Sequence, residues 1–233
     1  MKPIGTVESC FLDKFGTPRQ PGLATESRAF LRLVREVQPE FSLEGLAGFS
    51  HLWIIFIFHK NNTARFHAKV HPPRLNGKTT GLFSTRSPHR PNPIGLSLVK
   101  IEKIEVDGIW VSGIDIIDQT PILDIKPYLP TIESRPDASS GWTDLCESQN
   151  NMVEWSHDAL QLLNEITAQG DIRNLKKLIE EVLILDPRPQ VYKGYEGEDS
   201  PYRESHAVRL YNLDIHFQFL KPTHILVTKI VRL

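Results

Sequence analysis

The sequence has little cysteine and no long apolar segment. Its 233 residues include two cysteines, Cys10 and Cys146, which allow at most one disulfide, so a secreted disulfide scaffold does not fit. The longest apolar run, LWIIFIF at 52–58, is too short to cross a bilayer. The first residues lack the apolar core of a signal peptide. We therefore expect a soluble, cytoplasmic protein without membrane association.

Several common active-site motifs are also missing. The sequence contains no glycine-rich loop of the Rossmann or Walker type, and no G-x-S-x-G nucleophile motif. Four histidines lie close together, but their spacing matches no zinc pattern, and no cysteine lies among them: His51, His59, His67 and His71. We expect no metal site, and a metal-dependent hydrolase is a distant alternative.

Acidic residues are absent from a long central segment. Residues 45–101, 57 in all, contain eight lysines and arginines and no carboxylate, although the net charge of the whole chain is −1. A basic block is often only a solvated face. A segment of this length without one acidic residue nevertheless favours an anionic ligand, with nucleic acid a leading candidate.

The first 135 residues show the pattern of strands and loops. We expect strands at 4–11, 51–59, 94–106, 109–118 and 121–130, with a hairpin turn at Asp107-Gly108 and both faces of 51–59 buried. Residues 27–37 are the exception and are expected to form a short helix. Because no helix of crossover length separates the strands, the pattern predicts an antiparallel sheet, curled into a barrel.

Beyond residue 135 the pattern changes. Residues 134–142, SRPDASSGW, are typical of a linker, and an amphipathic helix is expected at 151–169. A second helix, capped by Asp171, is expected to end before Pro187, followed by strands at 207–220 and 224–233. The predicted fold is thus a mainly β N-terminal domain, a small antiparallel β-barrel rather than a Rossmann fold, at residues 1–138, with a smaller α+β C-terminal domain at residues 139–233.

Polar, proline-rich segments follow or precede several predicted strands. They are TPRQPG at 17–22, His59-Lys60, TRSPHRPNPIG at 85–95, DQTP at 118–121 and, in the second domain, DPRPQVYKG at 186–194. Each alone is most often a turn. Together they place stiff polar loops at strand ends, where barrels commonly build ligand sites.

These segments resemble a known family. PRQPG, FSHLWIIFIFH, TRSPHRPNPIGLS, D-x-x-D-x-TP-x-x-DIKPYLP and DPRP-x-x-YKG are similar to motifs of the TrmO family, also called YaeB or TsaA-like, which are tRNA (adenine-N6)-methyltransferases. The resemblance covers essentially the whole chain. It implies S-adenosylmethionine (SAM) as the methyl donor, a homodimer, and a substrate: N6-threonylcarbamoyladenosine beside the anticodon of a threonine tRNA.

The resemblance also implies positions for the cofactor contacts. They are Pro18, Arg19, Gln20, His59, Lys60, Arg86, Leu96, Asp118, Gln119, Thr120 and Pro121. A carboxylate such as Asp118 suits the ammonium or ribose of SAM, an arginine suits its carboxylate, and Leu96 could wall the adenine. The acceptor nitrogen must lose a proton, so a general base would help, and Asp186 is the candidate.

The remaining basic and polar residues are expected to contact the tRNA anticodon stem-loop. They are Arg65, Lys69, Arg74, Lys78, Arg90 and Asn92, together with Arg188, Tyr192 and Lys193 of the second domain. The alternative is a non-enzymatic RNA-binding module, which would share the basic segment but would not bind SAM.

Overall fold

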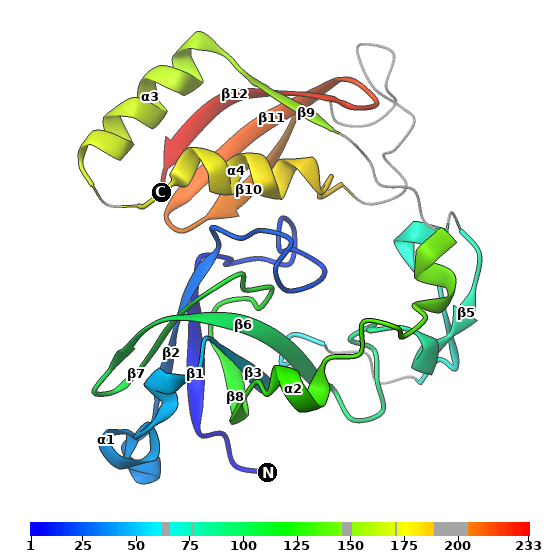
Figure 1. Ribbon diagram of the computed structural model, residues 1–233. Coiled ribbons are helices and arrows are strands. Elements are labelled where there is room, and N and C mark those ends of the chain that lie inside the picture. The colour runs from blue at the N-terminus through cyan, green and yellow to red at the C-terminus, as the bar shows by residue number, and fades with distance from the viewer. Residues whose placement is uncertain (62–65, 76, 146–150, 171, 189–204) are drawn as a thin grey trace.

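The computed structural model describes residues 1–61, 66–75, 77–145, 151–170, 172–188 and 205–233. Figure 1 shows two parts, a β-barrel that contains the N-terminus and an α+β unit that contains the C-terminus. The two folds predicted from the sequence are therefore confirmed. Among the described residues, no helix has the length and apolar character needed to cross a bilayer.

Six strands close the barrel. They are β1 (Gly5–Ser9), β2 (Arg28–Leu33), β3 (His51–Ile57), β6 (Ile94–Glu105), β7 (Gly108–Ser112) and β8 (Thr120–Pro127). Their order around the barrel is β1-β2-β7-β6-β3-β8, β8 pairs back to β1, and all of these pairs are antiparallel. A closed sheet has no free edge, so its backbone hydrogen bonds are satisfied internally.

The barrel interior is filled by alternate residues of each strand. Val7, Leu31, Ile54, Val99 and Ile122 are at most 1% exposed. Strand β3 alternates buried and partly buried positions, so the expectation that both of its faces are buried was wrong.

Residues 27–37 do not form the expected helix. Strand β2 occupies Arg28–Leu33, and a 3-10 turn, Arg35–Val37, follows it. Strands β1 and β7 flank β2 and hydrogen-bond to it on both sides. These pairings bury Ala29, Leu31 and Leu33 and therefore override the local pattern. A short helix, α1 (Pro39–Ser42), and a further 3-10 turn, Leu46–Gly48, lead to β3.

A separate small sheet lies between β3 and β6. Strands β4 (Lys69–Val70) and β5 (Thr80–Gly81) pair, with 3-10 turns at Pro73–Leu75 and Leu82–Ser84. In Figure 1 this segment stands away from the barrel. After the short helix α2 (Pro130–Glu133), the chain reaches the same segment through a 3-10 helix, Gly141–Leu145. There the indole N–H of Trp142 donates to the carbonyl of Ser84 at 2.8 Å.

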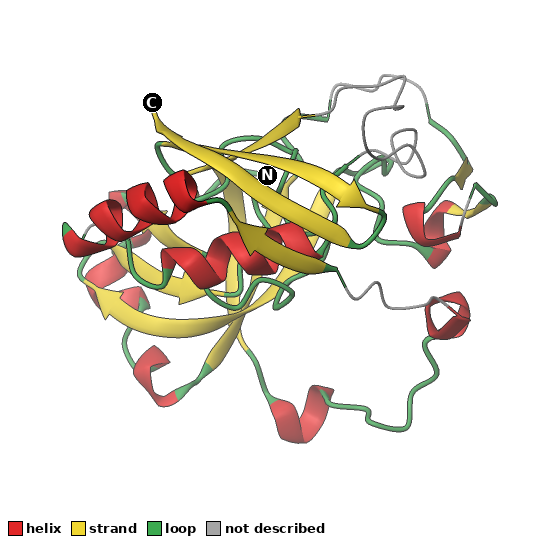
Figure 2. Ribbon diagram, turned by 90° about the horizontal axis from the view of Figure 1, so that it is seen from above, coloured by secondary structure: helices red, strands yellow, loops and turns green. Residues whose placement is uncertain are grey.

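The C-terminal unit is a four-stranded sheet with two helices. It comprises β9 (Met152–Trp155), α3 (His157–Ala168), α4 (Leu175–Ile184), β10 (Ser205–Leu210), β11 (Leu213–Lys221) and β12 (His224–Arg232), and the sheet order is β10-β11-β12-β9. Figure 2 shows α3 and α4 lying together along the sheet. Alternate residues of β11 and β12 are buried, as one covered face requires.

Three sequence-based boundaries in this unit were wrong. Residues 152–155 extend the sheet as β9 because they pair in parallel with β12, and helix α3 starts only after Ser156, whose hydroxyl accepts the N–H of Ala159. The cap of α4 is Asn174, while the expected cap, Asp171, lies outside the described residues. Residues 207–220 form two strands, which turn at Tyr211 with a φ of 53°.

The barrel and the C-terminal unit share one core. Phe11 forms an isolated bridge with Leu210, and the N–H of Tyr211 donates to the carbonyl of Cys10 at 2.8 Å. The thiol of Cys10 is free, and burial raises its pKa to about 12. Cys146 lies outside the described residues. The loop after β1 is thus fixed between the two units.

Candidate functional site

The polar segments meet at one end of the barrel. Antiparallel neighbours place the last residues of β1, β3 and β7 at the same end as the first residues of β2, β6 and β8. The loops 10–27, 58–93 and 113–119 therefore share this end. They carry ten of the eleven predicted cofactor contacts or lie directly beside them, and the exception is Leu96. The polar loops of the barrel domain thus lie at strand ends on one side of the barrel, and their role as a ligand site stays a prediction.

The first cluster joins β8 to the end of β3. Thr120 is 1% exposed, and its hydroxyl donates to the carbonyl of Ile117 at 2.7 Å and lies 3.3 Å from Nδ1 of His59. Burial lowers the pKa of His59, and the positive charges of Lys60 and Lys14 lower it further. The imidazole is therefore neutral near pH 7 and can act as a hydrogen-bond partner without adding positive charge.

Asp118 stands beside this cluster in a fixed orientation. Its Oδ1 accepts the backbone N–H of Ser9 at 2.9 Å, and its Oδ2 lies 3.3 Å from the side-chain nitrogen of Gln119. Gln119 has a left-handed φ of 60°, and its N–H donates to the carbonyl of Val7 at 2.8 Å. The turn between β7 and β8 thus presents a carboxylate at the barrel end.

Two lysines make hydrogen bonds between loops at this end of the barrel. The ammonium of Lys60 donates to the carbonyl of Leu12 at 3.1 Å, and the ammonium of Lys14 donates to the carbonyl of Lys60 at 2.7 Å. These reciprocal contacts tie the loop after β1 to the end of β3. They also concentrate positive charge beside His59.

The second cluster joins three loops through Arg86. The guanidinium of Arg86 donates to the side-chain oxygen of Gln20 at 2.7 Å. Asp115 lies within electrostatic reach of Arg86, and its Oδ1 accepts the hydroxyl of Ser97 at 2.5 Å. Burial raises the pKa of Asp115 to about 6, against smaller opposing effects of Ser97 and Arg86. The cluster contains one cation and one carboxylate that gains a proton easily.

The loop at 85–95 is held by its own side chains as well as by prolines. Asn61 donates to the carbonyl of Pro88 at 2.8 Å, and the guanidinium of Arg90 donates to the carbonyl of Thr85 at 3.0 Å. Arg90 also lies over the ring of Phe83, 5.6 Å from its centroid. Arg90 therefore has a structural role in the loop, in addition to the predicted contact with RNA.

Leu96 does not join these clusters. It is 53% exposed, whereas its neighbours Gly95 and Ser97 face the barrel interior. Gly95 is required there, because a Cβ would come within 2.2 Å of the ring of Phe56. The side chain of Leu96 therefore points outward from β6, away from the residues that the barrel end brings together.

The second-domain candidates occupy a different environment from the one expected. Asp186 and Arg188 are each 2% exposed and form a bidentate ion pair, with Nε to Oδ1 at 3.0 Å and Nη2 to Oδ2 at 3.2 Å. The guanidinium of Arg188 also lies 3.3 Å from the ring centroid of Phe219. The guanidinium of Arg188 is buried and paired, so its tRNA contact, which stays a prediction, would require this ion pair to open.

Asp186 interacts electrostatically with Arg19 of the barrel domain. Partial burial lowers the pKa of Arg19, and the negative charge of Asp186 opposes that change. The positive charge of Arg74 also lowers the pKa of Arg19. The C-terminal unit thus contributes charge near the PRQPG loop.

The predicted tRNA contacts of the central segment are exposed where they are described. Lys69, Arg74, Lys78 and Asn92 are all exposed. Two aromatic side chains accompany them: Phe66 is 56% exposed and Phe83 is 75% exposed. Arg65, Tyr192 and Lys193 lie outside the described residues.

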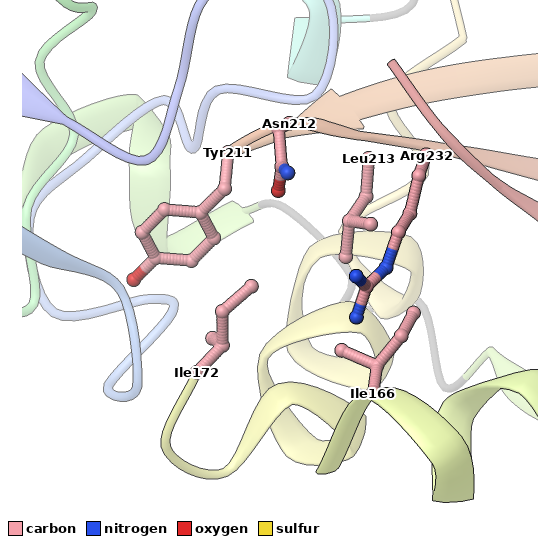
Figure 3. Close-up of a pocket in the computed structure, with 6 residues that line it drawn as sticks. All are labelled: Ile166, Ile172, Tyr211, Asn212, Leu213 and Arg232. Atoms are coloured by element: carbon pink, nitrogen blue, oxygen red, sulfur yellow. The ribbon is translucent and has the colours of Figure 1, made fainter. Parts of the chain in front are cut away.

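A pocket of about 280 Å³ lies elsewhere, in the C-terminal unit. Figure 3 shows its lining: Ile166, Ile172, Tyr211, Asn212, Leu213 and Arg232. None of the predicted site residues lines it. In the described part of the chain, no group of three or more histidine, cysteine or acidic side chains is placed to hold a metal ion.

Comparison with known proteins decides the family. The model of the tRNA-methyltransferase O N-terminal domain matches residues 6–134, and that of the TrmO C-terminal domain matches residues 148–233. The chain belongs to the TrmO family. The tRNA (adenine(37)-N6)-methyltransferase of Escherichia coli K12 is 36% identical over 220 residues, which cover 92% of this chain and 91% of that protein.

Other relatives agree. A Pseudomonas aeruginosa protein with the provisional name S-adenosylmethionine-dependent methyltransferase RcsF is 41% identical over 95% of this chain and 93% of its own length. The human tRNA (adenine(37)-N6)-methyltransferase is 54% identical over 64% of this chain but only 34% of its own length. A crystal structure of TrmO from P. aeruginosa superimposes with a TM-score of 0.80 at 37% identity, covering 99% of this chain and 95% of the other.

Some residues of the barrel end were not selected from the sequence. Asp115 lies in the D-x-x-D motif three residues before Asp118, but the sequence does not show that Ser97 and Arg86 face it. Asn61 follows His59-Lys60, and its bond to Pro88 depends on the fold. Lys14 is exposed and has no flanking motif. Their contacts are long-range and become visible only in three dimensions.

Proposed function

We propose that this protein is a SAM-dependent methyltransferase that adds a methyl group to N6 of adenosine 37 in tRNA. Its proposed substrate nucleoside is N6-threonylcarbamoyladenosine, beside the anticodon of threonine tRNA. One observation carries the proposal: both TrmO domain models match in order, and the polar loops of the barrel domain lie at one end of the barrel. The E. coli and human relatives carry the corresponding activity in their names.

The residues at the barrel end fit the chemistry of SAM. The carboxylate of SAM suits Arg86, whose guanidinium is oriented by Gln20 and has N–H groups left for a second partner. Asp118, held by the N–H of Ser9, suits the ammonium or the ribose hydroxyls. When bound, SAM supplies the electrophilic methyl group. The protein aligns that group with the acceptor nitrogen, and positioning is its main contribution to the rate.

The basic segment supports a tRNA substrate. Lys69, Arg74 and Lys78 would contact phosphates, which fixes position without reading sequence. Phe66 and Phe83, exposed beside them, offer stacking surfaces for unpaired bases of the anticodon loop. The β4–β5 segment that carries these residues stands out from the barrel, as a tRNA-contacting arm would (Figure 1).

Two further features belong to this proposal. The protein is proposed to act in the cytoplasm, where tRNA is modified, and as a homodimer. Multi-angle light scattering measures the mass directly, and a monomer at micromolar concentration would contradict the dimer.

The function is tested in cells and with purified protein. Mass spectrometry of tRNA nucleosides from cells lacking the gene should show loss of the N6-methylated threonylcarbamoyladenosine, with recovery when the gene is restored. Purified protein with SAM should methylate threonylcarbamoylated tRNA but not tRNA that lacks the threonylcarbamoyl group. Unchanged nucleosides in the deletion strain would overturn the proposal. RNA binding without SAM binding by equilibrium dialysis would instead indicate a non-enzymatic RNA-binding protein.

A further inference from the structure

Methylation at N6 of the proposed nucleoside releases the proton of its N–H group. N6 of threonylcarbamoyladenosine lies between an adenine ring and a carbonyl, both of which withdraw its lone pair. The nitrogen becomes a good nucleophile as its N–H proton is removed, so a carboxylate within reach of N6 would accelerate the transfer. The sequence alone indicated Asp186 for this role.

The structure does not favour Asp186. Both of its oxygens accept hydrogen bonds from the guanidinium of Arg188 inside the C-terminal unit, and 2% of the residue is exposed. Taking a proton would break this buried ion pair, which is costly. Asp118 is itself a predicted cofactor contact, and its two oxygens already face the N–H of Ser9 and the amide of Gln119.

Asp115 has the geometry of a proton acceptor. One oxygen, Oδ1, is fixed by the hydroxyl of Ser97 at 2.5 Å, which sets the rotamer of the carboxylate. In the described part of the chain, no side chain hydrogen-bonds to the other oxygen, Oδ2, and this oxygen is not among the buried side-chain atoms that lack a hydrogen-bond partner. Asp115 is partly exposed, in the turn between β7 and β8 that also carries Asp118.

Its surroundings join Asp115 to the cofactor cluster. The cation that acts on Asp115 is Arg86, which is bonded to Gln20 of the PRQPG loop. Ser97 points into the barrel from β6, so Asp115 lies at the barrel mouth, among the loops that carry the polar motifs of the barrel domain. A base at this position is adjacent to the residues proposed to hold the methyl donor.

We propose that Asp115 is the general base of the methyl transfer. In this step the N6 lone pair forms the new N–C bond to the methyl group. The methyl–sulfur bond breaks and leaves its electron pair on sulfur, which becomes a neutral thioether. The N6–H proton passes to Oδ2 of Asp115, and the carboxyl later releases it to water. The inference rests on the proposed function, because it requires an N–H acceptor.

The electrostatics of the site agree with this role. Desolvation raises the pKa of Asp115 to about 6, while Ser97 and Arg86 act in the opposite direction. A carboxylate with this pKa is ionised at neutral pH and is a stronger base than an ordinary aspartate. Burial therefore provides basicity, and Ser97 provides orientation.

Asp115→Asn tests the proposal with three measurements. Asparagine keeps the shape and can still accept the Ser97 hydroxyl, but it cannot take a proton. We expect unchanged thermal stability, SAM affinity within about threefold of wild type by calorimetry, and a kcat lowered by about 100-fold or more. The wild-type rate should fall as pH decreases through about 6, the pKa of Asp115, and the variant should lose this inflection.

Asp107→Asn is the matched control. Asp107 is followed by Gly108 in the turn between β6 and β7, at the opposite end of the barrel, and Asn-Gly is also a favourable hairpin pair.

A second variant, Ser97→Ala, removes a hydrogen bond that lowers the pKa of Asp115. It should move the inflection of the rate profile to higher pH. Carbon-13 NMR titration should show the same rise in the pKa of the Asp115 carboxyl in Ser97→Ala. The Asp115 signal is identified as the carboxyl signal that is missing from Asp115→Asn.

The outcomes separate the hypotheses. A kcat of Asp115→Asn within about threefold of wild type, or an unchanged pH inflection, would overturn the role of Asp115. Loss of SAM binding by a folded Asp115→Asn protein would also overturn it, since Asp115 would then be a cofactor ligand. If Asp115→Asn does not fold, an unmoved inflection in Ser97→Ala overturns the proposal, and an upward shift supports it. Failure of the proposed function looks different: wild-type protein would not methylate tRNA at any pH.

Discussion

The carboxylate of Glu181 on helix α4 accepts a hydrogen bond from the hydroxyl of Thr25 in the barrel, at 2.6 Å and across 156 residues of sequence. The other carboxylate oxygen accepts the N–H of Glu26 at 2.9 Å. Glu26 in turn accepts hydrogen bonds from Asn174 at 2.9 Å and Lys177 at 3.0 Å. The C-terminal unit thus holds the same loop that carries Pro18, Arg19 and Gln20.

Glu181→Ala should weaken this junction. The change leaves the Thr25 hydroxyl and the Glu26 N–H without their acceptor, so we expect a loss of about 1–2 kcal/mol in the free energy of unfolding. The affinity for SAM should fall as well, because the loop containing Gln20 loses its support. Thermal denaturation and calorimetry measure the two effects. Glu165→Ala, on the exposed face of α3, is the control and should change neither quantity. Full SAM affinity in a destabilised Glu181→Ala protein would show that the loop does not depend on the junction.

Arg86→Ala should affect cofactor binding more than tRNA binding. Removing the guanidinium deletes the proposed carboxylate partner and the contact with Gln20, and the Kd for SAM should rise about tenfold or more. Arg90→Ala should act mainly on tRNA affinity, with a smaller effect on SAM through the lost bond to Thr85. Isothermal titration with each ligand separates the two roles. Arg35→Ala, exposed at the opposite end of the barrel, is the control. Equal SAM affinities for Arg86→Ala and wild type would contradict the assignment.

The barrel could be predicted from the sequence because its strands are short, alternate in polarity and are separated by turn residues. The segment at 27–37 could not, because its alternation is interrupted where Ala29, Phe30 and Leu31 are all buried. The pairing of β2 with both β1 and β7 decides its conformation. Residues 152–155 were assigned to a helix for a related reason: their strand character comes from β12, about 70 residues away.

The candidate site, too, could be predicted from the sequence only in part. Proline-rich motifs identified the loops, and the resemblance supplied the residues, because both are properties of local sequence. The environment of each carboxylate is not local. Asp186 is paired with a buried arginine, whereas Asp115 accepts a serine hydroxyl on one of its oxygens. Which of them can accept a proton depends on side chains that the fold brings from other elements.

Asp186→Ala should therefore be a stability variant. It would leave Arg188 buried and without its carboxylate partner, and we expect the free energy of unfolding to fall by about 3–5 kcal/mol. Chemical denaturation measures the loss, and the specific activity of the remaining folded protein measures catalysis. Asp158→Ala, exposed in the first turn of α3, serves as the control. A stable Asp186→Ala protein with normal SAM binding and no methyl transfer would restore Asp186 as the base.

The lysines of the central segment should determine how tRNA binding depends on salt. Lys69 and Lys78 are exposed on the β4–β5 segment, and each phosphate contact releases condensed counterions. For each lysine replaced by alanine, the slope of log Kobs against log salt should become less steep by about 0.7–0.9, with SAM affinity unchanged. Fluorescence anisotropy with an anticodon stem-loop at several salt concentrations measures the slope. Lys229→Ala, exposed on β12, provides the comparison. An unchanged slope in the double variant Lys69→Ala, Lys78→Ala would place the RNA path on another face of the protein, because a phosphate contact cannot be lost without its counterion term.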